Sequence, residues 1–385
     1  MVALLMSPAR LNQTWVLRIS SAVLLLFVFL LGVKGLGDGF KLLGNDLIQD
    51  FFTATDDPFV GLIIGLLATT LVQSSSVTTA MIVGLVAVSD NPLPLANAVP
   101  MIMGANIGTT VTATLVSLAH MGRKEEFQRA FPVAICHDVF NYMSVLVLLP
   151  IELATGFLRK SATLIATLLE GVGGFRYESP LRSLLDTGFV PIRGLVEALF
   201  STQNGQATFL MFLAVCFIFF SLFFLVRTMR SLVHDRVEAA VHRALGSSAI
   251  FSMAVGMMVT VMVQSSSITT SLLVPLGGAG ILKLRDAFPI TIGANLGTTI
   301  TALLAALAVS GPNAVAGLEI ALVHLLFNIL GTVIIYPVET IRRVPLAMAE
   351  GLTRVAVRSR KTTVVAVAAF FYGVPALILF VARVL

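Results

Sequence analysis

A segment of eight residues occurs twice in this chain, and the recurrence limits the folds open to it. The sequence VQSSSVTT at Val72–Thr79 returns as VQSSSITT at Val263–Thr270, 191 residues later. Two more pairs follow in the same order, at offsets of 189 and 187 residues: GANIGTT at Gly104–Thr110 with GANLGTT at Gly293–Thr299, and HDVFN at His137–Asn141 with HLLFN at His324–Asn328. Three ordered matches predict one structural unit that is used twice.

The polar repeats lie in an apolar chain. Of the 385 residues, 57% are hydrophobic and 12% are charged, and the mean hydropathy is +0.96. Because a soluble domain has about 25% charged residues, the composition predicts a membrane protein. Seven stretches are long enough to cross a hydrocarbon layer of about 30 Å as helices. They are Trp15–Val33, Ala96–Ala119, Phe131–Ile151, Ala207–Val226, Ala287–Val309, Gly317–Val338 and Thr362–Val381.

The first apolar stretch is interpreted as a retained helix. Trp15–Val33 is longer than the apolar core of a cleaved signal peptide, which has about 7–15 residues, and no clear small-residue cleavage site follows it. Cys136 and Cys216 lie inside apolar stretches and are predicted to be packing residues, with no disulfide framework or metal site. The net charge of +5 comes mostly from short basic stretches beside membrane segments, which indicates orientation and not nucleic-acid binding.

The distribution of charge predicts the side of the membrane that each connection faces. The strongest basic cluster comprises Arg342, Arg343, Arg354, Arg358, Arg360 and Lys361. The positive-inside bias places this cluster, the basic N-terminus and the stretch after Val226 in the cytoplasm, and the acidic connection Asp38–Asp57 outside. The first QSSS segment then starts outside and the second starts inside.

Both starting sides are explained if each QSSS segment is a re-entrant helical hairpin with the serines at its tip. The halves Phe59–Val72 and Val77–Val88 are each shorter than the roughly 20 residues that a spanning helix needs. Two hairpins that enter from opposite sides make two inverted-topology repeats, an arrangement typical of secondary transporters. The alternative is that each QSSS segment is one kinked helix that spans the membrane.

The hairpin tips have the chemistry of an anion site. The residues after each tip start a half-helix, whose free N–H groups and dipole favour an anion. Serine hydroxyls and the glutamine amide add neutral donors. Two tips that meet near the middle of the membrane would surround a tetrahedral oxyanion without arginine or lysine, and co-bound cations would offset its charge. The alternative is that the serine triplets serve only close helix packing.

The GAN–GTT segments are predicted to bind cations such as Na⁺ through neutral oxygens. The candidate ligands are the amide oxygens of Asn106 and Asn295 and the hydroxyls of Thr109, Thr110, Thr298 and Thr299. The glycines Gly104, Gly108, Gly293 and Gly297 allow close backbone approach or break the helix and free its carbonyls. The alternative, a glycine-mediated helix contact, is compatible with a cation site.

Two residue types in the HDVFN and HLLFN segments point to different roles. Asp138, whose counterpart is Leu325, is a carboxylate inside an apolar stretch, where it is costly unless paired or bound to a cation. Asn141 shares its helix face. His137 and His324 are predicted to form hydrogen bonds between helices rather than to carry protons, because no chain of acidic residues accompanies them.

The paired QSSS segments, the GANIGTT and GANLGTT pair, and HDVFN followed by Val145–Pro150 resemble the type II sodium-dependent phosphate cotransporters, especially their bacterial members. The resemblance implies an all-α polytopic membrane protein of two inverted repeats that binds inorganic phosphate and Na⁺ and uses no other cofactor. The implied phosphate contacts are Gln73, Ser74, Ser75, Ser76, Gln264, Ser265, Ser266 and Ser267. The sodium candidates are Ser76, Thr79, Asn106, Thr109, Thr110, Asp138, Asn141, Ser267, Thr270, Asn295, Thr298, Thr299 and Asn328.

An aspartate at the position of Asp138 goes with electrogenic transport in the family, so the resemblance also implies an extra Na⁺ per phosphate. The predicted organisation has five parts. Residues 1–58 form an N-terminal membrane helix and the acidic outer connection, 59–151 repeat 1, 152–248 an outer loop, a membrane helix and a basic linker, 249–338 repeat 2, and 339–385 a basic segment and the C-terminal helix.

The predicted function is import of phosphate with Na⁺ across the plasma membrane, the inner membrane of a bacterium, with the N-terminus in the cytoplasm. The predicted partners are phosphate, Na⁺ and the lipid bilayer, not nucleic acid, and a homodimer is left open. One alternative is a sodium-coupled carrier of another small oxyanion, such as sulfate or a carboxylate. A second is an intramembrane serine hydrolase, although neither QSSS segment has the G-x-S-x-G context and no Walker A sequence is present.

Overall fold

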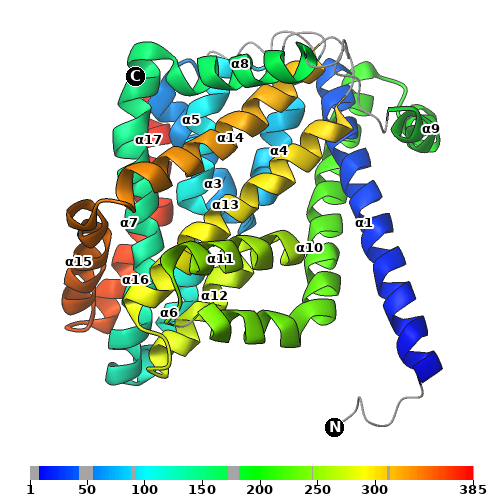
Figure 1. Cartoon of the computed structure of the whole chain (residues 1–385). Coiled ribbons are helices and arrows are strands. Elements are labelled where there is room, and N and C mark those ends of the chain that lie inside the picture. Colours follow the sequence, from blue (N-terminus) through cyan, green and yellow to red (C-terminus); the bar gives the residue numbers. More distant parts are fainter. Residues whose placement is uncertain are drawn as a thin grey trace.

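The computed structural model describes residues 8–42, 55–88, 92–171, 182–244, 246–309 and 313–384, and this part of the chain contains helices and no strands. Figure 1 shows the helices as a bundle of crossing elements with α8 along the top. In chain order the elements are α1 (Pro8–Leu42), α3 (Pro58–Val72), α4 (Ser75–Val86), α5 (Leu95–Gly108), α6 (Val111–Leu118), η2 (Ala119–Gly122), α7 (Lys124–Thr155), α8 (Phe157–Gly171), α9 (Arg182–Leu199), α10 (Gln203–Ala244), α11 (Ala249–Val263), α12 (Ser266–Gly278), α13 (Leu284–Ala308), α14 (Ala314–Ile335), α15 (Glu339–Ala356), α16 (Arg360–Ala368), η3 (Ala369–Gly373) and α17 (Val374–Val384).

Among the described residues, seven helical segments are long and apolar enough to cross a membrane, and each overlaps one of the seven predicted stretches. They are Val16–Gly39, Leu95–Gly122, Lys124–Thr155, Gln203–Thr228, Leu284–Ala308, Ala314–Ile335 and Arg360–Ala382. The predicted all-α polytopic membrane protein is therefore confirmed. The predicted outer connection is placed only in part, because its Asp46 and Asp50 lie outside the described residues.

The first QSSS segment joins two short helices that turn back on each other. Asn97, at the start of α5, donates from Nδ2 to Asp56 Oδ1 at 2.8 Å, just before α3. The backbone N–H of Leu93 donates to the carbonyl oxygen of Leu85, near the end of α4, at 3.1 Å. The start of α3 and the end of α4 therefore both lie beside the start of α5. This arrangement excludes one kinked helix that would carry the chain across the bundle at this point.

The pair α11 and α12 ends at the opposite side of the bundle. Arg129, near the start of α7, donates from Nε to the carbonyl oxygen of Gly278, the last residue of α12, at 2.9 Å. Asn313, just before α14, donates to the carbonyl oxygen of Val88, just after α4, at 2.7 Å. The α5–α6 segment begins after α4 and ends where α7 starts, beside the end of α12. α13 begins after α12 and ends before α14, beside the end of α4. The α5–α6 segment and α13 therefore run between the same two ends of the bundle in opposite directions. Figure 1 shows α3 and α4 above α11 and α12.

Glycines allow backbone contact where these helices cross. A Cβ atom added to Gly104 would overlap the carbonyl oxygen of Leu62, and one added to Gly65 would overlap that of Met101, so α3 and α5 touch through their backbones. The same contact joins α11 and α13 through Gly293 against Met253 and Gly256 against Ile290. The glycine-mediated helix contact considered from the sequence is thus present in both halves.

The two halves differ at the end of the GAN–GTT segment. α5 ends at Gly108 and α6 begins at Val111, whereas α13 continues unbroken through Gly297. A Cβ added to Gly108 would lie 2.7 Å from the Cβ of Thr69, and one added to Gly297 would lie 2.7 Å from the Cβ of Thr260. Of the two glycine roles that the sequence left open, close backbone approach is found in both halves, whereas a helix break is found only in the first.

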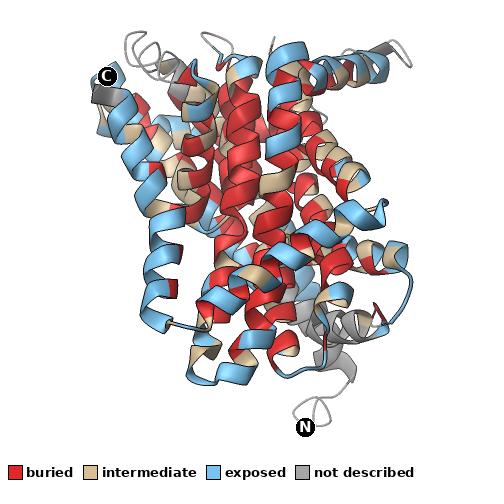
Figure 2. Cartoon of the chain, turned by 90° about the vertical axis from the view of Figure 1, so that its left-hand side faces the viewer, coloured by how far each residue is buried: buried red, intermediate tan, exposed pale blue. Residues whose placement is uncertain are grey.

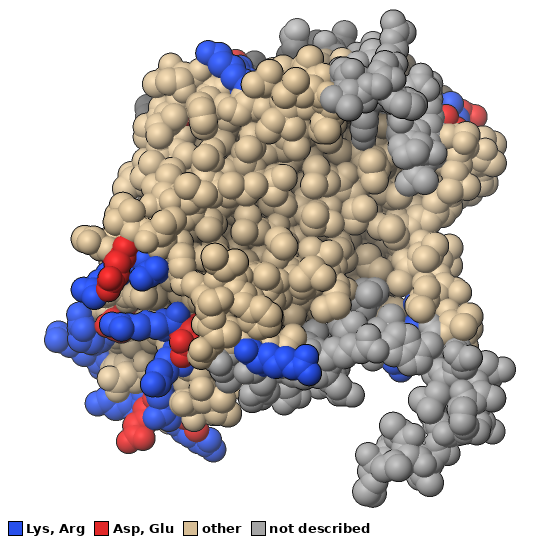
Figure 3. All heavy atoms as spheres, viewed as in Figure 1, with Lys and Arg blue, Asp and Glu red and all other residues tan. Residues whose placement is uncertain are grey.

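The surface fits a protein surrounded by lipid. Figure 2 shows buried residues concentrated in the inner helices and exposed ones along the outer helices. Many exposed residues on the outer helices are large and apolar, such as Phe220 and Phe223 of α10, each 53% exposed. Figure 3 shows a broad band almost free of charge, with Lys and Arg gathered at the lower left, where Figure 1 places α15 and α16.

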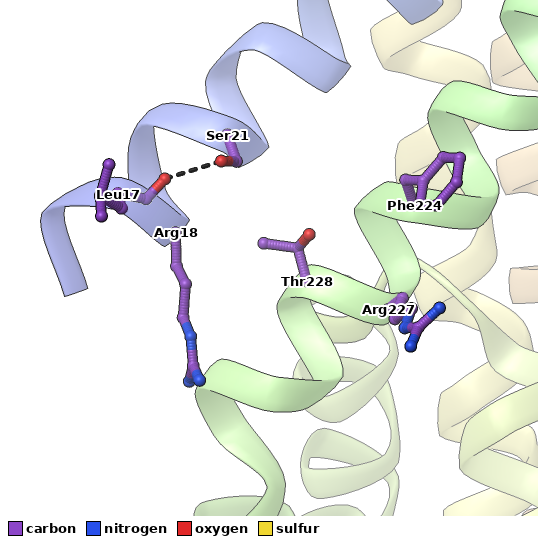
Figure 4. Close-up of a pocket in the computed structure, with 6 residues that line it drawn as sticks. All are labelled: Leu17, Arg18, Ser21, Phe224, Arg227 and Thr228. Carbon is purple, nitrogen blue, oxygen red and sulfur yellow. Dashed lines mark hydrogen bonds between the residues drawn. The ribbon is translucent and has the colours of Figure 1, made fainter. Parts of the chain in front are cut away.

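Near its lower end, the gap between α1 and α10 contains a pocket of about 320 Å³. Figure 4 shows the residues that line it, which are Leu17, Arg18, Ser21, Phe224, Arg227 and Thr228. The pocket holds none of the residues predicted to bind phosphate or Na⁺. It places two arginines near the ends of apolar helices, where long basic side chains reach from the apolar layer toward the membrane surface.

Candidate functional site

Each QSSS segment forms a tight turn whose shape depends on its glutamine. α3 ends at Val72, and Gln73 adopts the left-handed conformation with a φ of 59°, from which its N–H caps the carbonyl of Thr69. Gln264 does the same after α11 with a φ of 58°. These are the only non-glycine residues with positive φ in the described part of the chain. Because this conformation costs a side-chain-bearing residue about 1–2 kcal/mol, the fold keeps glutamine here against its backbone preference.

The serines after each glutamine begin the next helix with unused donors. Ser74 and Ser265 cap α4 and α12, and each hydroxyl accepts a backbone N–H three residues on at 3.3 Å. Ser75 and Ser266 are buried residues, and among the described residues neither hydroxyl forms a hydrogen bond. A helix N-terminus with an unpaired hydroxyl and free N–H groups favours an anion. This geometry is compatible with the anion site predicted for the tips, which stays a prediction.

Two threonines absent from the predicted site hold the glutamine side chains. Thr112 Oγ1 donates to Gln73 Oε1 at 3.2 Å, and Thr301 Oγ1 donates to Gln264 Oε1 at 3.1 Å. Ser76 Oγ in turn donates to Thr301 Oγ1 at 3.4 Å, so a hydrogen-bonded path links the two tips. The sequence does contain a signal for the two threonines, because the GTT repeat extends by two residues to GTTVT and GTTIT.

Histidines and asparagines connect the halves behind the tips. His137 Nε2 lies 3.2 Å from Asn295 Oδ1, and His324 Nε2 lies 3.3 Å from Asn106 Oδ1. An amide oxygen only accepts, so this pairing assigns the hydrogen to Nε2 in each histidine. Each half therefore supplies the histidine that holds the asparagine of the other half. The predicted role of the two histidines as bridges between helices is confirmed.

The four asparagines of the predicted sodium set meet in one network. Asn295 Nδ2 donates to Asn141 Oδ1 at 2.8 Å, and Asn141 Nδ2 donates to the carbonyl oxygen of Asn106 at 2.7 Å. Asn328 Nδ2 donates to Asn106 Oδ1 at 3.2 Å. The mirror image of the first bond is missing, because Asn106 Nδ2 donates to the carbonyl oxygen of Ile102 at 2.9 Å. Asn328 Oδ1 is buried and lacks a hydrogen-bond partner among the described residues.

The paired tips and this network can be compared with known proteins. The sequence matches the Na⁺/Pi-cotransporter family over residues 28–173 and 216–377. The chain belongs to this family. It is 32% identical over 432 residues to the sodium-dependent phosphate transport protein 2A of Oryctolagus cuniculus, which covers 94% of this chain and 67% of that protein. It is 31% identical over 441 residues to the sodium-dependent phosphate transport protein 2B of Homo sapiens, which covers 91% of this chain and 63% of that protein.

The chain thus spans about two thirds of the length of these two curated relatives. No solved structure matches it. The sequence-based resemblance to the type II sodium-dependent phosphate cotransporters is therefore confirmed by the family match, and the residue roles that the resemblance implied stay predictions.

In this cotransporter-family chain, Asp138 is a buried carboxylate with one free oxygen. Thr114 Oγ1 donates to Asp138 Oδ2 at 2.9 Å, whereas Oδ1 lacks a hydrogen-bond partner among the described residues. Asp138 is 4% exposed, and Leu325 occupies the equivalent position of the second half. An unpaired carboxylate oxygen at this depth suits a cation. Thr114 is a second neighbour of the site that the sequence-based reasoning missed.

The threonines of the predicted sodium set share one geometry. Each donates its hydroxyl hydrogen to a carbonyl oxygen three or four residues earlier, as seen at Thr79, Thr109, Thr110, Thr270, Thr298 and Thr299. Such a hydroxyl keeps its oxygen lone pairs for a cation. Ser267, the equivalent of Ser76 in the second half, is partly buried. Among the described residues its hydroxyl forms no bond like the one from Ser76 to Thr301. The role of these residues in sodium binding stays a prediction.

Proposed function

We propose that this chain is a secondary active transporter that imports inorganic phosphate together with Na⁺. The observation that carries the proposal is the pair of QSSS tips, which are joined through Ser76, Thr301 and Gln264. Each tip has a buried serine at a helix N-terminus whose hydroxyl forms no hydrogen bond among the described residues. The tips offer neutral donors to an oxyanion from two sides. The family and its two relatives described above, which are sodium-dependent phosphate transport proteins, support phosphate as that oxyanion.

The two halves act, in this proposal, as inverted-topology repeats in the plasma membrane. The opposite directions of the α5–α6 segment and α13 support it, as do hydrogen bonds that set the two helix pairs at opposite ends of the bundle. The basic residues near α15 and α16 favour a cytoplasmic lower end in Figure 1, which gives a cytoplasmic N-terminus. In a bacterium this membrane is the inner membrane. Movement of one repeat against the other would expose the shared site to each side in turn.

Sodium supplies the driving force in this proposal and offsets the charge of the anion. The free oxygens of Asp138 and Asn328 are the strongest candidate ligands because both are buried and have no hydrogen-bond partner in the described part of the chain. A carboxylate that binds Na⁺ here adds a cation position that the second half, with Leu325, cannot reproduce. The resulting import would move net positive charge inward.

A serine hydrolase is a poorer fit to the same residues. The buried histidines His137 and His324 pair through Nε2 with asparagines and not with a serine. A hydrolase also needs one nucleophile, whereas both tips keep a serine hydroxyl that forms no hydrogen bond in the part of the chain that the structure describes. Replacing Ser75 and Ser266 singly by alanine separates the two functions, because transport requires both serines and hydrolysis requires one.

The decisive experiment measures uptake of labelled phosphate by proteoliposomes that contain the purified chain, under inward gradients of Na⁺, K⁺ or H⁺. We expect uptake only with Na⁺, no competition from excess sulfate, and strong loss in Ser75→Ala and in Ser266→Ala. Ser21→Ala is the matched control, since this serine lies on α1 and bonds only to the carbonyl oxygen of Leu17 at 2.8 Å. Uptake without a Na⁺ gradient, or uptake retained in both tip variants, would refute the proposal.

A further inference from the structure

The C-terminal membrane segment reaches the first QSSS tip through one tyrosine. Tyr372 lies in η3, a π-helical turn that interrupts the helical segment from α16 to α17. Its hydroxyl donates to the carbonyl oxygen of Thr70 at 3.1 Å and accepts a hydrogen bond from Gln73 Nε2 at 3.3 Å. The neighbouring Phe371 is 1% exposed and packs against Val111 of α6. π-Helical turns inside α-helices frequently mark functional sites.

This contact makes the two glutamines unequal. Gln73 Nε2 also donates to the carbonyl oxygen of Thr70 at 3.2 Å, so its two N–H hydrogens both have partners. Gln264 Nε2 donates to the carbonyl oxygen of Val261 at 2.7 Å and has no second partner among the described residues. The repeat therefore gives each tip the same glutamine, whereas the C-terminal segment occupies the second hydrogen of only one of them.

Gln73 can reach a bound anion only by giving up one of these bonds. The side-chain amide has two hydrogens, and the carbonyl of Thr70 and the hydroxyl of Tyr372 take both. The carbonyl belongs to the end of α3 and stays in place with that helix, whereas the tyrosine hydroxyl belongs to a different segment. The bond to Tyr372 is the one that can be exchanged without unwinding α3. Gln73 is exposed, so an entering ligand meets it at the surface of the tip.

We propose that Tyr372 is a positioning residue that holds the Gln73 amide in the empty site and competes with the transported anion for it. The inference rests on the proposed function, since it takes phosphate as the ligand of the tips. Phosphate binding then exchanges the tyrosine hydroxyl for a phosphate oxygen at Gln73 and frees η3 from the tip. Among the described residues only Gln73, and not Gln264, donates to a tyrosine of the C-terminal segment, so the two tips bind the anion with different affinity.

The test is equilibrium binding of labelled inorganic phosphate to the purified full-length chain in saturating Na⁺. A neutral hydrogen bond is worth about fivefold in an equilibrium constant, so Tyr372→Phe should lower the phosphate Kd about fivefold. Tyr372→Met, which also lacks the hydroxyl, should tighten binding similarly. Tyr336→Phe is the matched control, because Tyr336 follows α14 and none of its hydrogen bonds involves either tip. Its Kd should equal that of the unmodified chain.

A double-mutant cycle shows whether the effect passes through Gln73. In a Gln73→Ala background, Tyr372→Phe should leave the Kd unchanged, because no amide remains to be released. Unchanged or weaker binding in Tyr372→Phe, or the same tightening in both backgrounds, would overturn the inference. If the unmodified chain binds phosphate and either of these results is found, only the inference about Tyr372 is rejected. If the unmodified chain does not bind phosphate, both the proposed function and the inference are rejected.

Discussion

The bond network predicts that Thr301, a residue outside both polar tips, controls the affinity for phosphate. Thr301 is 2% exposed, and its hydroxyl donates to Gln264 Oε1 at 3.1 Å and accepts from Ser76 Oγ at 3.4 Å. Thr301→Val keeps the side-chain shape and removes both bonds. The bond to the glutamine is worth about 1 kcal/mol, and the longer one contributes less. Leaving Gln264 Oε1 without its donor adds a further cost, so we expect a total of about 1–2 kcal/mol.

This loss corresponds to a roughly five- to thirtyfold rise in the KM for phosphate, measured as Na⁺-driven uptake into proteoliposomes. Thr301→Ser keeps the hydroxyl and should stay near the unmodified value. Thr112→Val is the matched variant in the other half. It loses one bond of 3.2 Å to an exposed glutamine and has no bond to the opposite tip, so its effect should be smaller.

An unchanged KM in Thr301→Val would refute the reasoning that the threonine positions the tip. Equal effects of Thr301→Val and Thr301→Ser would assign the change to packing rather than to the hydroxyl. An effect of Thr112→Val as large as that of Thr301→Val would remove the role given to the bond between the two tips.

Three further predictions concern charge, packing and the tip turn. Asp138→Gly removes the buried carboxylate and should lower the charge moved per phosphate, so an unchanged ratio of current to phosphate flux would count against a cation at this position. Gly293→Ala places a Cβ on the carbonyl oxygen of Met253 and should lower the free energy of unfolding by about 1–3 kcal/mol. Gly194→Ala is the control and should not lower it, because its Cβ meets no atom within 4 Å. Equal melting temperatures of the two variants would contradict the contact between α11 and α13. The melting temperature of Gln73→Gly should be at least as high as that of Gln73→Ala, because only glycine adopts a φ of 59° without strain. Both variants should lose phosphate uptake. A higher melting temperature for the alanine variant would show that the turn is not strained.

The sequence predicted the membrane helices and the hairpin halves well because both depend on local properties. The length of an apolar stretch predicts a spanning helix, and the prediction Phe59–Val72 differs from α3 by a single residue. A turn within the QSSS segment was also expected, since polar residues interrupt two stretches too short to span. The sequence placed the three serines at its tip, whereas the turn is at Gln73 and α4 already begins at Ser75. The bridging role of His137 was predicted because no chain of acidic residues accompanies it, whereas its partner Asn295 was not predicted.

The missed residues are those whose role depends on distant partners. Thr112 and Thr301 lie in the repeat, yet nothing in the repeat states that they meet the glutamines. The sequence left open whether the GAN–GTT glycines allow close backbone approach or break the helix. Both halves show the close approach, and only the first segment also ends a helix, at Gly108. The two segments differ only at Ile107 and Leu296, yet their helices end differently, so the local sequence alone does not set the helix end.

By itself, the sequence determined that the chain spans a membrane, that one polar unit is used twice, and that neutral donors stand at helix starts. These conclusions follow from hydrophobic length and from the chemistry of single side chains. Only the tertiary structure decided which of the two equivalent glutamines meets Tyr372 and which of the four asparagines keeps a free oxygen. A hydrogen bond requires two atoms within about 3.5 Å, and residues 299 positions apart reach that distance only through the packing of the whole bundle.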